Sequence, residues 1–79
     1  MKRNERLYDD MPPEELLAEG AEPTILVRPA NGDGVHRFPF YPGEGLPEAL
    51  ARARAKVPDA VAFDLQVYRR GRFYYAHLD

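Results

Sequence analysis

The chain has 79 residues, with 13 acidic and 11 basic side chains and a formal net charge of −2, and this length allows one small domain that buries only about 60% of the surface of its unfolded chain. Because the sequence contains no cysteine, no serine and a single threonine, Thr24, it excludes a disulfide framework, a cysteine metal site, a serine or cysteine nucleophile and a phosphate-binding P-loop. The isoelectric point near 5.6 argues against a protein that is basic over its whole surface.

The charges are unevenly distributed along the chain. Residues 1–34 carry four Lys or Arg against eight Asp or Glu, whereas residues 35–79 carry seven against five. Although Lys2 and Arg3 stand near the amino terminus, no apolar run follows them, so the pattern contains neither a signal peptide nor a membrane span. We therefore expect a cytoplasmic protein that has no membrane partner.

Residues 1–23 are expected to form an acidic amino-terminal arm in front of a single α+β domain at residues 24–79. The sequence Pro-Pro-Glu-Glu at residues 12–15 favours the start of a short helix, and Gly20 should end it. Such a short helix is marginal in isolation and persists only if it docks. The acidic residues of the arm are more typical of a solvated terminus than of a site for a basic partner.

Two β-rich runs, Thr24–Pro29 and Val35–Phe40, are expected to form the first hairpin. Between them, Asn-Gly and Asp-Gly pairs at residues 31–34 supply the positive-φ positions that tight turns require. Pro39 has no amide hydrogen to donate, which favours an edge position for the second strand. Whether two or four residues make the turn, one side of the hairpin carries Ile25, Val27, His36, Phe38 and Phe40.

One amphipathic helix is predicted between this hairpin and the next. It begins at Leu46 or Pro47 and ends before Pro58, since proline cannot continue a helix. Its apolar residues follow helical spacing along one side. They are Leu46, Ala49, Leu50, Ala53 and Val57.

The second hairpin is predicted from residues 60–69 and 72–78, with Arg70-Gly71 as a two-residue turn. This register sorts the side chains onto two faces by period-2 alternation. The apolar face carries Val61, Phe63, Leu65, Val67, Tyr74, Ala76 and Leu78. The other face carries Asp64, Gln66, Tyr68, Phe73, Tyr75 and His77.

The expected order along the chain is therefore arm, strand, strand, helix, strand, strand. Since one amphipathic helix can cover one face of a four-stranded sheet, we predict an α+β two-layer sandwich. It has one main helix on a largely antiparallel sheet in β-β-α-β-β order, with the short helix of the arm in front. The order of the strands within the sheet is left open.

The uncovered face of the second hairpin brings together three rings and two polar side chains: Tyr68, Phe73, Tyr75, Gln66 and His77. An exposed aromatic cluster of this kind is typical of a contact surface. We predict a small intracellular, non-enzymatic binding or regulatory protein that makes protein–protein contacts and self-associates through this face. Alternatively, the amino-terminal arm covers the same rings. Its apolar residues are Leu7, Tyr8, Leu16 and Leu17.

A nucleic-acid-associated module is the alternative function. Arginines at the hairpin turn could contact phosphates while the neighbouring rings stack on bases. The basic residues concerned are Arg69, Arg70, Arg72, Arg52 and Lys56. Against this function, the net charge is negative, whereas domains that bind through counterion release are usually far more basic.

Catalysis and metal binding are not expected. In the predicted register Asp64 faces His77, and such a pairing could orient an imidazole. The two histidines, His36 and His77, lack the further spaced ligands of a metal motif, and the carboxylates show no glycosidase-like pair. We therefore predict no catalytic residue, no metal site and no cofactor.

Residues 49–75 resemble a PepSY-type half-module. They combine a helix with spaced alanines at residues 49–55, a turn with proline at residues 57–61, and a hairpin that ends in Arg-Phe-Tyr-Tyr at residues 72–75. The resemblance implies an α-β-β unit and carries over no functional residue. PepSY modules are typically exported or membrane-linked, and this sequence shows no export signal.

Overall fold

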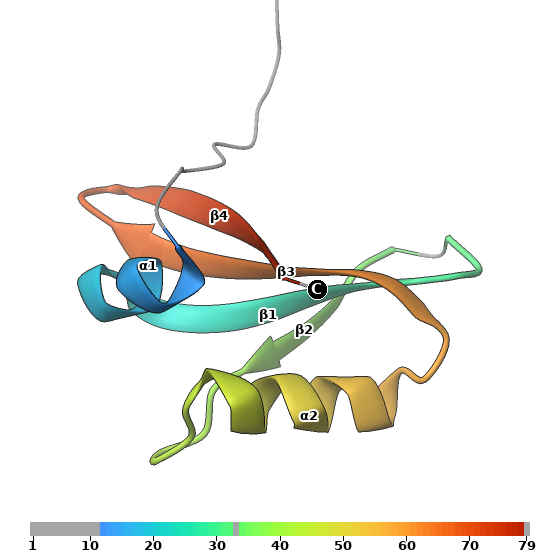
Figure 1. The fold of residues 1–79 in the computed structure, drawn as a ribbon. Coiled ribbons are helices and arrows are strands. Elements are labelled where there is room, and N and C mark those ends of the chain that lie inside the picture. The colour runs from blue at the N-terminus through green and yellow to red at the C-terminus, as the bar shows by residue number, and fades with distance from the viewer. Residues whose placement is uncertain (1–11, 33, 79) are drawn as a thin grey trace, which may run out of the picture.

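The computed structural model describes residues 12–32 and 34–78, and over these residues the chain forms one four-stranded antiparallel sheet with two helices (Figure 1). In chain order the elements are α1 (Pro13–Glu19), β1 (Ala21–Pro29), β2 (His36–Pro39), α2 (Leu46–Lys56), β3 (Ala60–Arg69) and β4 (Arg72–Leu78). The predicted α+β class is thus confirmed. Neither of these two helices is long and apolar enough to cross a membrane.

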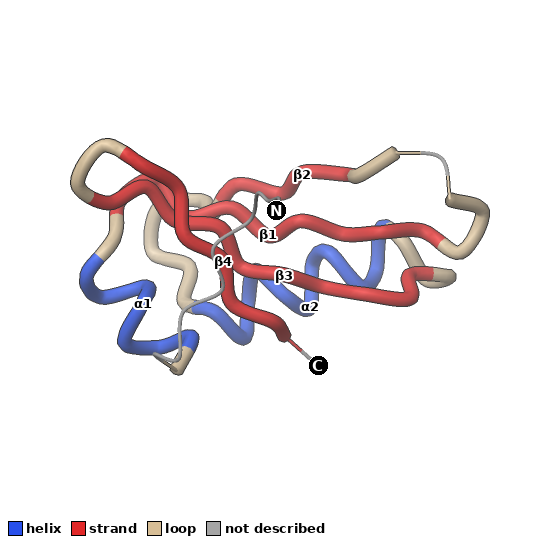
Figure 2. Tube along the Cα trace, turned by 90° about the horizontal axis from the view of Figure 1, so that it is seen from above, coloured by secondary structure: helices blue, strands red, loops and turns tan. Residues whose placement is uncertain are grey.

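The strands lie in the order β2-β1-β3-β4, so that β1 and β3 are central and β2 and β4 form the two edges (Figure 2). The pairing of β1 with β3 joins the two hairpins into one sheet. Residues 25–27 of β1 and residues 63–67 of β3 are all buried. The middle of the sheet is therefore shielded on both faces, although both helices lie on one of them.

In the first hairpin, Ile25 pairs with Phe38, so the two residues share one side of the hairpin as predicted. β1 begins at Ala21 rather than at the predicted Thr24 because the chain passes from α1 into the strand with little intervening loop. The pairing of this added segment with β3 is irregular, and Glu22 there has a φ of 54°.

β3 and β4 pair in the register that the alternation predicts, with Val67 opposite Tyr74 and the turn at residues 70–71. Arg70 and Gly71 have φ values of 54° and 86°, and a type I′ turn requires positive φ at both central residues. The twist of this turn matches the right-handed twist of the strands, so the hairpin forms without a bulge.

α2 covers the part of the sheet formed by β1 and β2. Ala49 and Ala53 of α2 are fully buried and pack with Ile25, Val27 and Phe63. Their small side chains allow the helix to approach the sheet closely, while the larger strand residues fill the space between the two layers. This packing explains why an alanine-rich helix forms one half of the core.

α1 covers the other half of the same face, where it contacts β3 and β4 (Figures 1 and 2). Leu16 is completely buried and packs with Leu65, Val67 and Ala76. The helix has seven residues, too few to be stable in isolation, and this buried leucine accounts for its persistence.

The position of α1 corrects one of the alternatives raised by the sequence. Leu16 and Leu17 pack on the helix-covered face of the sheet, so they do not cover the aromatic face. Leu7 and Tyr8 lie outside the described residues. The proposed boundary between arm and domain stays a prediction.

Gly20 lies at the junction between α1 and β1. Its φ of −103° is an ordinary extended value, and its N–H donates to the carbonyl oxygen of Leu16. A Cβ at this position would lie 2.5 Å from Cβ of Val67. Glycine is therefore needed because α1 approaches β3 closely, and not because the helix ends in a left-handed conformation.

Candidate functional site

The rings predicted to form a contact surface lie on the face of the sheet opposite both helices. Tyr68 of β3 lies directly across from Phe73 of β4, and Tyr75 follows on the same face of β4. The ring centroids of Tyr68 and Phe73 are 5.2 Å apart with an interplanar angle of 66°, an arrangement that the aromatic quadrupole favours. The two residues remain 40% and 44% exposed. We call the surface formed by Tyr68, Phe73, Tyr75 and His77 the aromatic surface.

Gln66 belongs to the same face but contributes little accessible surface. It pairs with Tyr75 across the hairpin and is only 7% exposed, while Leu26 and Asp64 beside it are 5% and 8% exposed. The accessible rings are therefore concentrated toward the β4 edge, and the middle of this face is buried. Gln66 therefore adds little to the accessible area of the aromatic surface.

The predicted pair of Asp64 and His77 is present. The two residues lie opposite each other, with Nδ1 of His77 2.9 Å from Oδ1 of Asp64. The imidazole is 72% exposed and the carboxylate side chain 11%. When Nδ1 carries the proton it donates to the carboxylate, which fixes the orientation of the ring. Among residues 12–32 and 34–78, no three His, Asp or Glu side chains are placed to share a metal ion.

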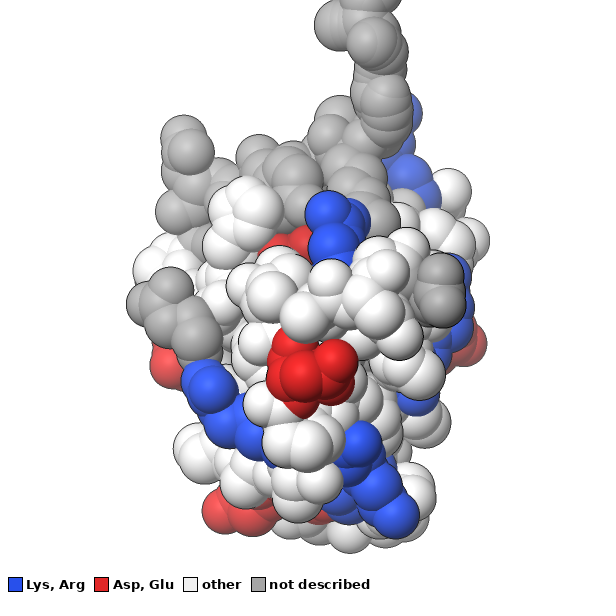
Figure 3. All heavy atoms as spheres, turned by 90° about the vertical axis from the view of Figure 1, so that its right-hand side faces the viewer, with Lys and Arg blue, Asp and Glu red and all other residues white. Residues whose placement is uncertain are grey.

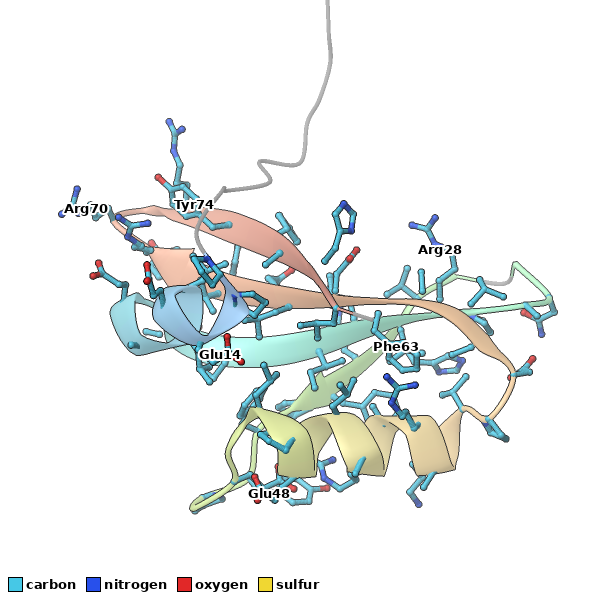
Figure 4. All side chains as sticks on the ribbon, viewed as in Figure 1. Glu14, Arg28, Glu48, Phe63, Arg70 and Tyr74 are labelled. Carbon is cyan, nitrogen blue, oxygen red and sulfur yellow. The ribbon has the colours of Figure 1, made fainter. Side chains whose placement is uncertain are left out.

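The arginines of the second hairpin are not gathered beside the rings. Arg69 lies over the ring of Tyr74, with 5.1 Å from its Cζ to the ring centroid, and Nη2 is 3.9 Å from Oε1 of Glu19 in α1. It therefore belongs to the helix side of the sheet. Arg72 is exposed and lies opposite Arg69 in the strand register. Arg70 lies at the tip of the hairpin (Figure 4).

Arg52 of α2 instead fastens the connection between β2 and α2. Its Nε and Nη2 donate to the two carboxylate oxygens of Glu44 at 2.9 and 2.7 Å, and Nη2 also donates to the carbonyl oxygen of Pro39 at 2.7 Å. The guanidinium lies 3.7 Å from the ring centroid of Tyr41. The hydrogen bonds from Arg52 and from the N–H of Tyr41 lower the pKa of Glu44 from 4.5 to about 2. Lys56 lies exposed in the last turn of α2, so neither residue joins the hairpin arginines.

Two other arginines share the face of the aromatic surface, and they were not among the predicted site residues. By register, Arg37 of β2 lies opposite Leu26, and Arg28 of β1 lies opposite Ala62. Arg28 points away from both helices (Figure 4). A shallow hollow in this part of the face is lined by Leu26, Arg28, Val35, Ala62 and Asp64. Alternation along the first hairpin puts both arginines on the side opposite Ile25 and Val27, but only the pairing of β1 with β3 shows that this side adjoins the rings.

The end of the molecule formed by the β1–β2 hairpin and the carboxyl end of α2 carries charges of both signs. Acidic and basic side chains are interspersed there rather than gathered by sign (Figure 3). Such a surface lacks the single-sign field that attracts a nucleic acid backbone.

Comparison of the chain with models of protein families, with curated proteins and with solved structures found no significant match. The resemblance of residues 49–75 to a PepSY-type half-module therefore receives no support from the family models.

Proposed function

We propose that the chain is a small non-enzymatic, cytoplasmic protein-binding module, and that its first partner is a second copy of itself. Contact is made through the aromatic surface. The observation that carries this proposal is the edge-to-face pair of Tyr68 and Phe73, which stays more than a third exposed on a sheet face opposite both helices.

The pair has the properties of an interface anchor. Aromatic side chains are enriched in protein interfaces and among the residues that dominate binding energy. Tyr68 and Phe73 are held on neighbouring strands of a regular hairpin, so binding would not have to order a loop. The centre of the same face, including Gln66, is buried.

Sedimentation velocity over a range of concentrations tests the proposal. We expect the wild-type chain of 9.0 kDa to reach twice its monomer mass, and the variants Tyr68→Ala and Phe73→Ala each to raise the dimer Kd by at least about tenfold, as loss of an interface anchor does. Val61→Ala is the matched control, because Val61 is an exposed apolar residue, 65% accessible, outside the aromatic surface. A wild-type chain that stays monomeric contradicts the proposal. A dimer whose Kd is unchanged in both ring variants contradicts it as well.

The nucleic-acid alternative stays a prediction, and the positions of its arginines give it less support. Arg52 is bound to Glu44, and Arg69 lies over Tyr74 on the helix side. Titration with labelled single- and double-stranded oligonucleotides at two salt concentrations tests this alternative. Binding that weakens as salt rises would favour it over self-association, since phosphate contacts release counterions.

A further inference from the structure

We propose that Asn31 is a site of spontaneous covalent modification. Its side chain deamidates through the peptide nitrogen of Gly32, and the native β1–β2 turn holds this reaction back until the hairpin opens. The reaction does not depend on the proposed function, because this turn lies at the end of the sheet opposite the β3–β4 turn and therefore away from Tyr68 and Phe73 (Figure 2).

The sequence makes residue 31 the more reactive of the two asparagines in the chain. Asn31 is followed by glycine and Asn4 by Glu5. Glycine has no Cβ to crowd the nitrogen that attacks the asparagine side chain, whereas the side chain of a glutamate hinders that attack. Asn31 and Gly32 are also both exposed, so that water and base reach the peptide bond between them.

The reaction needs only base and water. The peptide nitrogen of Gly32 loses its proton and forms a bond to Cγ of Asn31, while the side-chain amide group leaves as ammonia. The product is a five-membered succinimide ring. Water then opens this ring at one of its two carbonyl groups. Cleavage between the nitrogen and Cγ gives aspartate, and cleavage between the nitrogen and the main-chain carbonyl carbon gives isoaspartate, in which the main chain runs through Cγ.

The native turn opposes the first of these steps. The succinimide nitrogen is planar, so Cγ of Asn31 must take the position that the amide hydrogen of Gly32 occupied. In the folded chain this N–H donates to the carbonyl oxygen of Pro29, with 3.2 Å between nitrogen and oxygen. On the other side of Asn31, the N–H of Ala30 donates to the carbonyl oxygen of Asp59 at 3.1 Å. Ring closure therefore requires the turn to open.

The β1–β2 hairpin can open without unfolding of the whole domain. β2 has only four residues and, among the described strands, pairs with β1 alone. Its Phe38 is partly buried and packs against the core from this edge. Local opening of such an edge costs less free energy than global unfolding. We therefore expect the rate of deamidation to follow the opening of this hairpin.

Deamidation in the folded and the unfolded chain tests the proposal. The full chain is incubated at mildly alkaline pH with and without urea, and mass spectrometry after chromatography separates the aspartate and isoaspartate products. A peptide of residues 29–35 in the same two solvents corrects for the effect of urea on the chemistry. We expect the reaction at residue 31 to be at least about tenfold slower in the folded chain. In Asn31→Gln it should disappear, because ring closure from the longer side chain is much slower. Equal corrected rates, or no isoaspartate in urea, overturn the proposal.

Two core variants then show which opening controls the rate. Phe38→Ala removes a contact that holds β2 on the core, so it should raise the rate in the folded chain several-fold. Leu16→Ala is the control, because it weakens the core at α1, under β3 and β4, and should raise the rate less. Circular dichroism shows that both variants are folded during the incubation. A rate that Phe38→Ala leaves unchanged, or that both variants raise equally, overturns control by the hairpin.

Discussion

Replacement of Gly20 by alanine should destabilise the protein strongly, because α1 meets β3 at this residue. The added Cβ would lie 2.5 Å from Cβ and 2.6 Å from Cγ2 of Val67, and 3.2 Å from the carbonyl oxygen of Leu16. Cβ of Val67 is attached directly to the backbone of β3 and cannot rotate away. The end of α1 must therefore retreat by about 0.9 Å to reach an ordinary contact of 3.4 Å. Overpacking costs about 1–3 kcal/mol. Because Cβ of Val67 and the carbonyl oxygen of Leu16 are both fixed to the backbone, we expect a loss of free energy of unfolding of about 3 kcal/mol.

Urea unfolding followed by circular dichroism measures this loss. A domain of this size has a free energy of unfolding of about 4–12 kcal/mol, and with a urea m-value of about 1–3 kcal/mol/M the midpoint should fall by about 1–3 M. Gly45→Ala is the matched control. Gly45 also has an extended φ, of −93°, and its added Cβ would first meet the movable end of the Glu48 side chain at 3.0 Å. Equal midpoints for Gly20→Ala and Gly45→Ala would refute the close contact between α1 and β3.

Three further variants test other parts of the fold by urea unfolding. Leu16→Ala should cost about 2–5 kcal/mol, because Leu16 is fully buried between α1 and the sheet; a loss below about 1 kcal/mol would show that α1 does not dock there. Arg70→Asn should raise stability by about 0.5–1 kcal/mol, since Arg70 has a φ of 54° and asparagine adopts the left-handed conformation more readily; an unchanged or lower midpoint contradicts the turn geometry. In Glu44→Gln the urea midpoint should fall less between pH 4.5 and pH 2 than it does in the wild-type protein. The pKa of Glu44 is lowered from 4.5 to about 2 in the folded protein, so its bond to Arg52 contributes fully above pH 4.5 and is lost as the pH falls toward 2; parallel pH profiles for Glu44→Gln and wild type would exclude this contribution.

Both hairpins were predictable from the sequence because their signals are local. Glycine and asparagine at the turns allow positive φ, and period-2 alternation then fixes which side chains share a face. The register of Tyr68 with Phe73 follows from these two facts and is the one observed. The main helix was equally predictable, since its apolar stripe and the following Pro58 set its extent. Alternation along this hairpin therefore predicts that Tyr68, Phe73 and Tyr75 share one face of the sheet, as the register shows.

The strand order and the docking of α1 were not predictable, because both depend on contacts between segments far apart in the chain. Placing β1 beside β3 buries Gln66 and brings Arg28 onto the face of the rings, and no pattern within a single hairpin indicates this. One signal was nevertheless present and unused. Alternation puts Arg69 on the side of Val67, opposite Tyr68, so the separation of this arginine from the rings could have been read from the sequence.

The two faces of β3 and β4 connect the fold to the proposed function. Leu16 packs under Val67 and Ala76 on the helix side, while the neighbouring residues Tyr68 and Tyr75 project from the other face of the same strands. β4 pairs with β3 along its whole length, and α1 adds contacts to both strands from the helix side. Strands that are packed on their helix side can present the rings in one geometry, and a preformed surface loses less conformational entropy when a partner binds. The short helix α1 is therefore part of the core beneath the strands that carry the aromatic surface.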